Sequence, residues 1–160
     1  MTSEAQTSIR PATRDDVGAI VKMMAEFEDH LAALGGTECR FDSASAVKKL
    51  EYDGFGPQPL FSAVIASSGS QPVGYAIYSL GYWADGLEGT LYLTDLFVRE
   101  AWRGRGTGRA IVEFLASVAR EAGCQRMLWT VWRRNPAARR FYESLGAQAI
   151  EDEVLMTLRL

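Results

Sequence analysis

The chain contains few of the side chains that bind metal ions or form disulfide bonds. Among its 160 residues there is one histidine, His30, and there are two cysteines, Cys39 and Cys124, far apart in the sequence. A structural zinc site requires more such ligands, so we expect no metal centre. The absence of a Cys-x-x-Cys pair and of a disulfide framework indicates a reducing, cytoplasmic setting.

Long apolar runs are also absent. No stretch approaches the roughly 20 apolar residues that a membrane-spanning helix needs, so we expect no membrane partner. Residues 1–8 are polar and include Glu4, unlike a secretory signal or a transit peptide, and we expect them to form a disordered tail. Residues 9–160 contain no repeats and no low-complexity linker, and they are long enough to form a single domain with its own core.

Charge is unevenly distributed along the chain, although the net charge is only −3. Residues 99–140 contain ten arginines and three acidic residues, whereas the remainder carries seven basic and seventeen acidic residues. This division suits a protein that holds an anionic ligand in one half and attracts a cationic ligand to the other. Scattered surface charge would give the same totals, so the pattern needs support from a motif.

Hydrophobic periodicity predicts a domain of the α/β (α+β) class with mixed strands. Thr13 and Asn135 are expected helix N-caps, and glycines are expected at the C-terminal ends of helices. Turn residues at 54–57 and 67–70 separate the neighbouring elements. The predicted strands are 9–12, 60–66, 73–80, 90–98, 127–132 and 154–160. Four helices are predicted: from Thr13 to about Gly35, over 44–50, from the glycine-rich segment at 103–108 to Gly123, and from Asn135 to Gly146.

The most informative segment is Arg103-Gly104-Arg105-Gly106-Thr107-Gly108. An apolar strand-like run, 91–98, precedes it, and a segment with helical periodicity follows it. Glycines remove the Cβ atoms that would block a close approach to the backbone. The start of a helix adds unpaired N–H donors and a partial positive charge. This strand, loop and helix therefore predict a phosphorylated ligand.

Two familiar phosphate-binding loops do not fit this segment. A P-loop requires Lys-Ser or Lys-Thr after its last glycine, but Gly108 is followed by Arg109 and Ala110. A dinucleotide-binding loop requires Gly-x-Gly-x-x-Gly and an acidic residue about 20 positions later. This chain has Gly-x-Gly-x-Gly instead, and Trp129-Thr130-Val131 at the later position.

A third pattern, Arg-x-x-Gly-x-Gly, is met by Arg103, Gly106 and Gly108. It resembles the pyrophosphate loop of the GNAT superfamily of acyl-CoA N-acyltransferases. The later segment from Asn135 to Gly146, NPAARRFYESLG, resembles that family's segment with an asparagine near the pantetheine and a tyrosine near the thiol. The resemblance implies a GNAT-like mixed, mostly antiparallel central sheet, flanked by helices and splayed at the acetyl-CoA site.

Further segments resemble the diamine (spermidine/spermine) N-acetyltransferase branch, namely 10–13, 53–56, 92–98, 103–104 and 123–124. One difference bears on the substrate. That branch commonly has a glutamate that helps to hold the amine where this chain has Thr94, and Arg133 stands where polyamine enzymes can have an acidic residue. Both changes weaken cation binding, which argues against polyamines as acceptors.

The resemblance implies acetyl-CoA as co-substrate and two binding segments for it. Backbone N–H groups of Arg103 to Arg109 would hold the pyrophosphate, with the Arg103 and Arg105 side chains contacting either phosphate or solvent. The end of the preceding strand would pair with the pantetheine, and one of its N–H groups would meet the acetyl carbonyl. The expected coenzyme-binding residues are Leu96, Phe97, Val98, Arg103, Gly104, Arg105, Gly106, Thr107, Gly108, Arg109, Asn135, Ala137, Ala138 and Tyr142.

Tyr142 and Asp95 are the candidate catalytic residues. The phenol of Tyr142 can give a proton to the coenzyme A thiolate. Strand alternation predicts Asp95 on an apolar face shared with Leu93 and Phe97, where a carboxylate needs a partner or a task, and this makes Asp95 the first candidate base. Other residues expected around the acceptor amine, as bases or through charge and ring faces, are Glu26, Glu28, His30, Trp83, Asp85, Thr94 and Trp129.

The sequence thus predicts an enzyme that transfers acetyl from acetyl-CoA to a primary amine of a small molecule that is diamine-like, amino-acid-derived or an aminoglycoside. Because no cysteine or serine lies in a nucleophile motif, direct attack in a ternary complex is expected. The resemblance also implies a homodimer. Acetylation of a protein or peptide amine and non-catalytic acyl-CoA sensing are the alternatives. The acidic remainder of the chain argues against nucleic-acid binding by the arginines.

Overall fold

A computed structural model describes residues 7–36 and 42–160. By its internal contacts the chain divides into two units, Met1–Thr130 and Val131–Leu160, and each is considered by itself. Residues 1–6 and Cys39 lie outside the described ranges. Thr7 and Ser8, which the sequence assigned to a disordered tail, instead pair with Ser68 and Ser67 in the first strand.

The first unit contains a five-stranded sheet whose strands lie side by side in chain order. Neighbouring strands are antiparallel, except that the fourth and fifth are parallel. The predicted mixed, mostly antiparallel sheet is therefore confirmed. The strands are β1 (Thr7–Pro11), β2 (Ser62–Ser68), β3 (Gln71–Trp83), β4 (Glu88–Val98) and β5 (Cys124–Leu128).

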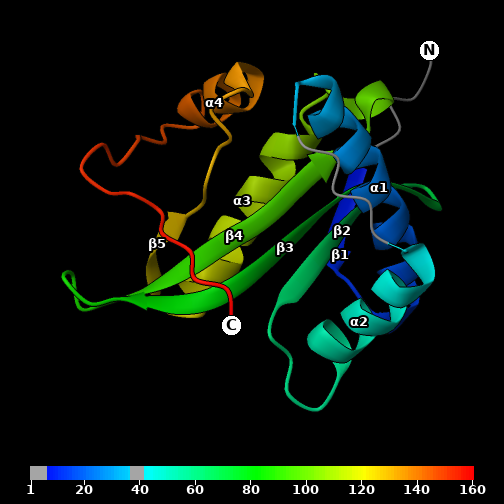
Figure 1. The fold of residues 1–160 in the computed structure, drawn as a ribbon, viewed down its shortest axis with the longest axis horizontal. Coiled ribbons are helices and arrows are strands. Elements are labelled where there is room, and N and C mark those ends of the chain that lie inside the picture. Colours follow the sequence, from blue (N-terminus) through cyan, green and yellow to red (C-terminus); the bar gives the residue numbers. More distant parts are fainter. Residues whose placement is uncertain (1–6, 37–41) are drawn as a thin grey trace. The chain divides into compact units, whose positions relative to one another are not determined.

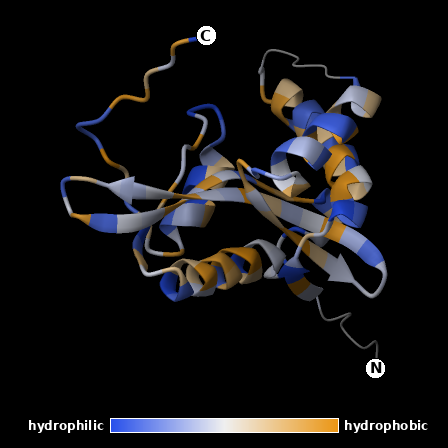
Figure 2. Ribbon diagram, turned by 90° about the horizontal axis from the view of Figure 1, so that it is seen from below, coloured by the Kyte–Doolittle hydropathy of each residue, from blue (hydrophilic) through white to orange (hydrophobic). Residues whose placement is uncertain are grey.

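Helices cover both faces of this sheet. Figure 2 shows the sheet edge-on, with α3 (Thr107–Glu121) on one face and α1 (Val17–Ala33) and α2 (Ser43–Phe55) on the other, and Figure 1 shows the same elements face-on. Burying apolar area on both faces is the main favourable term in folding. The core beneath α1 consists of Ile20, Met23, Ala63, Ile65, Tyr75, Ile77 and Phe97, and α3 buries Ile111, Leu115 and Ala119.

Local signals fix where α1 and α3 begin. A short 3-10 turn, Arg14–Asp16, leads into α1, and the Asp16 carboxylate accepts a hydrogen bond from the Thr13 N–H at 2.7 Å. Arg10 binds both oxygens of the same carboxylate at 2.7 and 2.8 Å, which lowers the pKa of Asp16 to about 2. Gly106 is the N-cap of α3, and Gly123, with φ +77°, follows its C-terminal end as predicted.

Several predicted elements have other bounds in the structure, and the difference is largest for α2 and β5. Helix α2 extends to Phe55 instead of ending at residue 50, so the predicted turn over 54–57 begins too early. Gly54 permits this extension, since a Cβ atom there would lie 2.5 Å from the Phe61 ring. Strand β5 covers Cys124–Leu128, not 127–132, because its ladder with β4 starts at the Gly89–Cys124 pair.

The second unit contains one helix, α4 (Pro136–Glu143), as predicted. The Asn135 side chain caps it by accepting a hydrogen bond from the Ala138 N–H at 3.1 Å. The predicted strand over 154–160 is wrong for the described chain: these residues have no regular structure, and Val154 and Met156 are 79% and 82% exposed. A strand needs a neighbour for its backbone groups, and no described strand pairs with this segment.

None of the helices in the described ranges is both long enough and apolar enough to cross a membrane.

Candidate functional site

Strand β4 has an open edge at its C-terminal end. It pairs with β5 only from Gly89 to Tyr92, whereas β4 itself continues to Val98. The Arg99 N–H donates to the Val73 carbonyl of β3 at 2.9 Å. Arg99 and Val73 therefore form a hydrogen-bonded pair of the antiparallel ladder, and every second residue before Arg99 also directs its N–H group toward β3. Antiparallel alternation then directs the N–H groups of Leu96 and Val98 away from β3, toward the edge that β5 leaves uncovered. This is the splay that the sequence predicted.

The glycine-rich loop follows this open edge directly. Gly104 and Gly106 have φ angles of +71° and +83°, which side-chain-bearing residues rarely adopt. No heavy atom lies within 4 Å of the position that a Cβ would take at either glycine, so both backbones face open space. Within the described chain no side-chain hydrogen bond caps the start of α3, where the helix dipole favours an anion. An uncapped helix start beside bare backbone fits a pyrophosphate.

The arginines of the loop make contacts within the protein. Arg103 Nε donates to the Val98 carbonyl at 2.9 Å, and its guanidinium lies 5.6 Å from the centre of the Phe97 ring. Arg105 lies over Trp102 at 5.2 Å, and Arg109 is 3.9 Å from Glu113. Their charge makes the loop basic, while Gly104 and Gly106 leave its main chain uncovered.

Asp95 lies on the face of β4 that α1 covers. The register between β3 and β4 shifts at this point: Asp95 is opposite Ile77, but Leu93 is opposite Tyr78. Because consecutive residues of β3 point to opposite faces, Asp95 shares a face with Phe97 and not with Leu93. The prediction that all three share a face is wrong for Leu93, since Thr94 is an extra residue that forms a β-bulge.

The Asp95 carboxylate has three polar neighbours. The Tyr75 hydroxyl donates to Asp95 Oδ2 at 2.5 Å. Burial raises the pKa of Asp95 to about 6; the Tyr75 and Leu96 N–H hydrogen bonds oppose that rise, and the negative charge of Glu28 adds to it. A carboxyl group that titrates near neutrality has the proton affinity a general base requires.

Sequence reasoning missed Tyr75. A tyrosine inside an apolar central strand does carry a signal, because a buried phenol hydroxyl needs a hydrogen-bond partner. The sequence does not show, however, which residue accepts the hydrogen bond of the Tyr75 hydroxyl. Only the cross-strand register brings Asp95 within reach.

Helix α1 brings further predicted residues to the same face. The Glu26 carboxylate binds Arg99 at 2.7 and 2.9 Å and is thereby committed to an ion pair. Glu28 acts electrostatically on both Tyr75 and Asp95. Burial, with a smaller effect of the Arg103 charge, lowers the pKa of His30. Of these residues, Glu28 has the closest electrostatic link to Asp95.

Trp83 and Asp85 are not part of this group. Trp83 is opposite Glu88 at the far end of the β3–β4 ladder, six residues along β3 from the partner of Asp95. At about 3.3 Å per residue this separation is roughly 20 Å. The Arg126 guanidinium covers the Trp83 ring at 4.7 Å. Trp83 thus lies far from Asp95 along the sheet, and the roles expected of Trp83 in the acceptor pocket and of Asp85 as a base stay predictions.

Thr94 and Trp129 lie where the strands part. Thr94 is the bulged residue and is exposed. Trp129 directly follows Leu128, the last residue of β5 that pairs with β4. Both stand beside the open edge.

The remaining predicted residues belong to the second unit. Ala138 and Tyr142 are four residues apart on α4, which puts them on one side of the helix, with Ala137 in its first turn and Asn135 at its cap. The Tyr142 ring lies 5.0 Å from the Phe141 ring. The asparagine and tyrosine of the motif thus share one short, capped helix.

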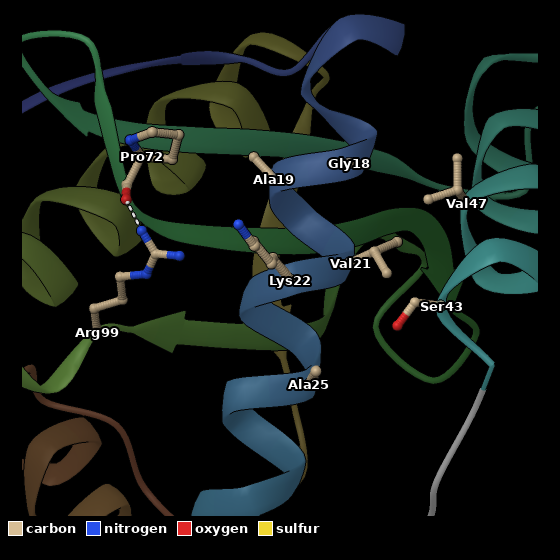
Figure 3. A pocket seen from close by; sticks show the side chains of 9 residues that line it. All are labelled: Gly18, Ala19, Val21, Lys22, Ala25, Ser43, Val47, Pro72 and Arg99. Carbon is tan, nitrogen blue, oxygen red and sulfur yellow. Dashed lines mark hydrogen bonds between the residues drawn. The ribbon is translucent and has the colours of Figure 1, made fainter.

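A pocket of about 490 Å³ lies elsewhere in the first unit (Figure 3). Gly18, Ala25 and Lys22 of α1 form its floor, and residues of α2 and the Arg99 side chain flank it. Arg99 Nη1 donates to the Pro72 carbonyl at 2.7 Å. None of the residues predicted for the site lines this pocket.

Comparisons with known proteins agree with this geometry. The model of the family described as "Acetyltransferase (GNAT) family" matches residues 21–147. Thialysine N-epsilon-acetyltransferase of Mus musculus is 33% identical, over 92% of this chain and 88% of that protein. Spermidine/spermine N(1)-acetyltransferase-like protein 1 of Homo sapiens is 31% identical, over 95% of this chain but 22% of that protein. The solved structure of an integron cassette protein from the mobile metagenome of V. cholerae has a TM-score of 0.82 at 25% identity, covering 96% of this chain and 92% of that one.

Proposed function

The chain belongs to the acetyltransferase (GNAT) family and is an N-acetyltransferase, and we propose that it moves an acetyl group from acetyl-CoA to a primary amine on a small, amino-acid-derived molecule. The observation that carries this proposal is the open edge of β4 directly before an uncapped, glycine-rich helix start, with Asp95 on the same stretch of strand.

The coenzyme binds through main-chain groups. The amides of the loop after Arg103 hold the pyrophosphate, which has the charge and size for a helix N-terminus, whereas the Arg103 N–H donates to the Glu100 carbonyl at 3.1 Å. The open edge from Leu96 to Val98 pairs with the pantetheine and the acetyl carbonyl: the Val98 N–H faces this edge, whereas the Leu96 N–H donates to the Asp95 carboxylate. The resemblance of the motif adds Asn135, Ala137 and Ala138 to the proposed coenzyme contacts.

The reaction is a direct attack in a ternary complex. Asp95 takes a proton from the acceptor ammonium, and the neutral amine then forms a bond to the thioester carbon. A backbone N–H of the open edge stabilises the oxyanion. The C–S bond breaks, and the departing thiolate receives a proton from Tyr142. The second proton that the nitrogen loses returns to the Tyr142 phenolate through solvent, which leaves the amide and coenzyme A, and the proton taken by Asp95 is released to water. Cys124 is buried opposite Gly89 at the start of β5, away from the open edge. It is therefore not placed to act as a nucleophile that carries the acetyl group, which supports direct attack by the amine.

The acceptor class rests on charge and on the named relatives. Asp95 and Glu28 put acidic groups on the face beneath α1, which favours a cationic amine. The mouse relative is named for the ε-amine of an amino acid, and the human relative for polyamines. Thr94 and Arg133 disfavour a polyamine, so an amino-acid side-chain amine is the better fit. We further propose that the enzyme is a cytoplasmic homodimer.

The test is release of free thiol from acetyl-CoA in the presence of candidate acceptors. We expect amino acids with side-chain amines to give the fastest release, ahead of polyamines, aminoglycosides and lysine peptides. Tyr142→Phe should lower kcat roughly tenfold or more while acetyl-CoA affinity measured by calorimetry stays unchanged. Binding of acetyl-CoA without thiol release by any acceptor would show a sensor instead, and no heat of binding at millimolar acetyl-CoA would exclude the coenzyme site.

A further inference from the structure

We propose that Tyr75 is a positioning residue for acetyl transfer: its hydroxyl holds the Asp95 carboxylate in the orientation and charge state that proton acceptance from the amine requires. The proposal rests on the role of Asp95 in the proposed function. It goes further by assigning a task to a core residue that touches neither coenzyme nor acceptor.

The Tyr75 ring is a rigid support for that hydroxyl. Tyr75 is completely buried in β3, and its ring centre lies 6.2 Å from that of Phe97. Apolar side chains from α1, β2 and β3 surround it, and in such a close-packed core its side chain stays in one rotamer. The hydroxyl is the only polar atom of the side chain, and it donates to Asp95 Oδ2 at 2.5 Å.

The contact lies in the regular part of the β3–β4 ladder, next to the bulge at Thr94. Tyr75 is directly opposite Phe97, and Asp95 is its diagonal neighbour across the ladder, a distance that a long aromatic side chain can reach. The bulge follows on the other side of Asp95 and leaves Leu93 on the opposite face, so that Asp95 and Phe97 share the face of Tyr75. The register of the strand next to the open edge therefore brings this carboxylate to a core phenol.

A donated hydrogen bond favours the charged form of a carboxylate. The other groups around Asp95 have separate effects. The Leu96 N–H on β4 acts in the same direction as Tyr75, and the Glu28 carboxylate on α1 acts in the opposite one. Arg99, on the same face of β4, is committed to Glu26 and to the Pro72 carbonyl. Tyr75 thus keeps Asp95 ionised against the effects of burial and Glu28.

The experiment compares pH profiles of kcat/KM for the wild type, Tyr75→Phe and Glu28→Gln, with Tyr78→Phe as the control. Tyr78 is in the same strand but on the opposite face, opposite Leu93. Loss of the Tyr75 hydroxyl destabilises the Asp95 anion and should move the acid limb up by about one pH unit. Glu28→Gln should move it down. Tyr78→Phe should leave it in place.

Tyr75→Phe keeps the ring and removes one oxygen, so the variant retains its packing. A ¹³C titration of the Asp95 carboxyl by NMR reports the same shift without any activity. An unmoved Asp95 titration and an unmoved acid limb in Tyr75→Phe would overturn the proposal, whatever happens to the melting temperature. The role of Asp95 is tested separately: if Asp95→Asn keeps wild-type turnover, the base assignment fails and the proposal fails with it, although thiol release by the wild type would still establish acetyl transfer.

Discussion

The loop from Arg103 to Arg109 and the Asp95 cluster, defined as Asp95, Tyr75 and Glu28, stand beside the same end of β4 but use different parts of the chain. The loop offers main-chain N–H groups, and its arginine side chains contact Val98, Trp102 and Glu113. The cluster depends on single side-chain oxygens inside a packed core. We expect the loop to tolerate side-chain changes and to be sensitive to backbone changes, and the cluster to behave in the opposite way.

The largest expected effect comes from Asp95→Asn, which removes the charge of the cluster and keeps its shape. Turnover should fall by about 10²- to 10⁴-fold, because the general base is lost, while acetyl-CoA affinity should stay the same. Calorimetry and thiol release on one preparation separate the two quantities. Equal losses in both would mean that Asp95 and the loop act as one site.

The same variant should be more stable than the wild type at neutral pH. Asp95 has a folded-state pKa of about 6, above its ordinary value of 3.8. The folded state is therefore stabilised by protonated Asp95 below pH 3.8, and this stabilisation is lost as the pH rises through 6. Asparagine avoids this loss, which is worth up to about 3 kcal/mol at pH 8. Urea unfolding at pH 8 and pH 4 checks it: the gain should be absent at pH 4, and a destabilised variant at pH 8 would contradict the raised pKa.

Asp16 is a matched carboxylate away from both regions. Asp16→Asn should lower the free energy of unfolding, whereas Asp95→Asn should raise it. The Arg10 ion pair and hydrogen bonds lower the pKa of Asp16 to about 2, so its contribution is present above pH 3.8 and is lost as the pH falls through 2. We expect about 2 kcal/mol of destabilisation at pH 7 with unchanged turnover. The same unfolding series measures it, and a stabilised Asp16→Asn would show that the two carboxylates do not differ as described.

Gly106→Ala tests the main chain of the loop, with Gly69→Ala as its control. Both glycines have positive φ, +83° and +56°, and both have open space at the Cβ position, so each alanine should cost about 1 kcal/mol of stability. Only Gly106 is at the N-cap of α3. We therefore expect acetyl-CoA affinity to fall roughly tenfold in Gly106→Ala and to stay the same in Gly69→Ala. Equal affinities would mean that the loop does not bind through its backbone.

The smallest effect is expected from Arg105→Ala. Its guanidinium is exposed and lies over Trp102, and a surface charge of this kind contributes about 1 kcal/mol at most. Acetyl-CoA affinity should fall about threefold, and less at high salt. If Arg105→Ala lost more acetyl-CoA affinity than Gly106→Ala, the arginine side chains of the loop, and not its main chain, would be the groups that bind the coenzyme.

The parts that could be predicted from the sequence are those that neighbouring residues decide. Gly104, Gly106, Gly123 and Gly146 all have positive φ, and Asn135 caps α4 through its own side chain. A turn, a cap or a helix start involves residues a few positions apart, so composition and spacing are enough to predict it. The glycine-rich helix start and the capped helix with Tyr142 could be predicted for this reason.

The parts that could not be predicted depend on strand register and on partners distant in sequence. The bulge at Thr94 moves Asp95 relative to Leu93, and the ladder separates Trp83 from Asp95 by the length of a strand. The alternating residues 154–160 read as a strand, but alternation predicts a strand only where a neighbour accepts its hydrogen bonds.

The sequence by itself determined that this protein has a glycine-rich helix start, a capped helix with the tyrosine motif and a mixed sheet. Only the tertiary structure decided that the Tyr75 hydroxyl meets the Asp95 carboxylate and that the Val98 amide faces an open edge. The reason is physical: φ preferences and capping act within a few residues, whereas the proton affinity of a carboxylate depends on burial and on donors that the packing of separate strands and helices brings to it.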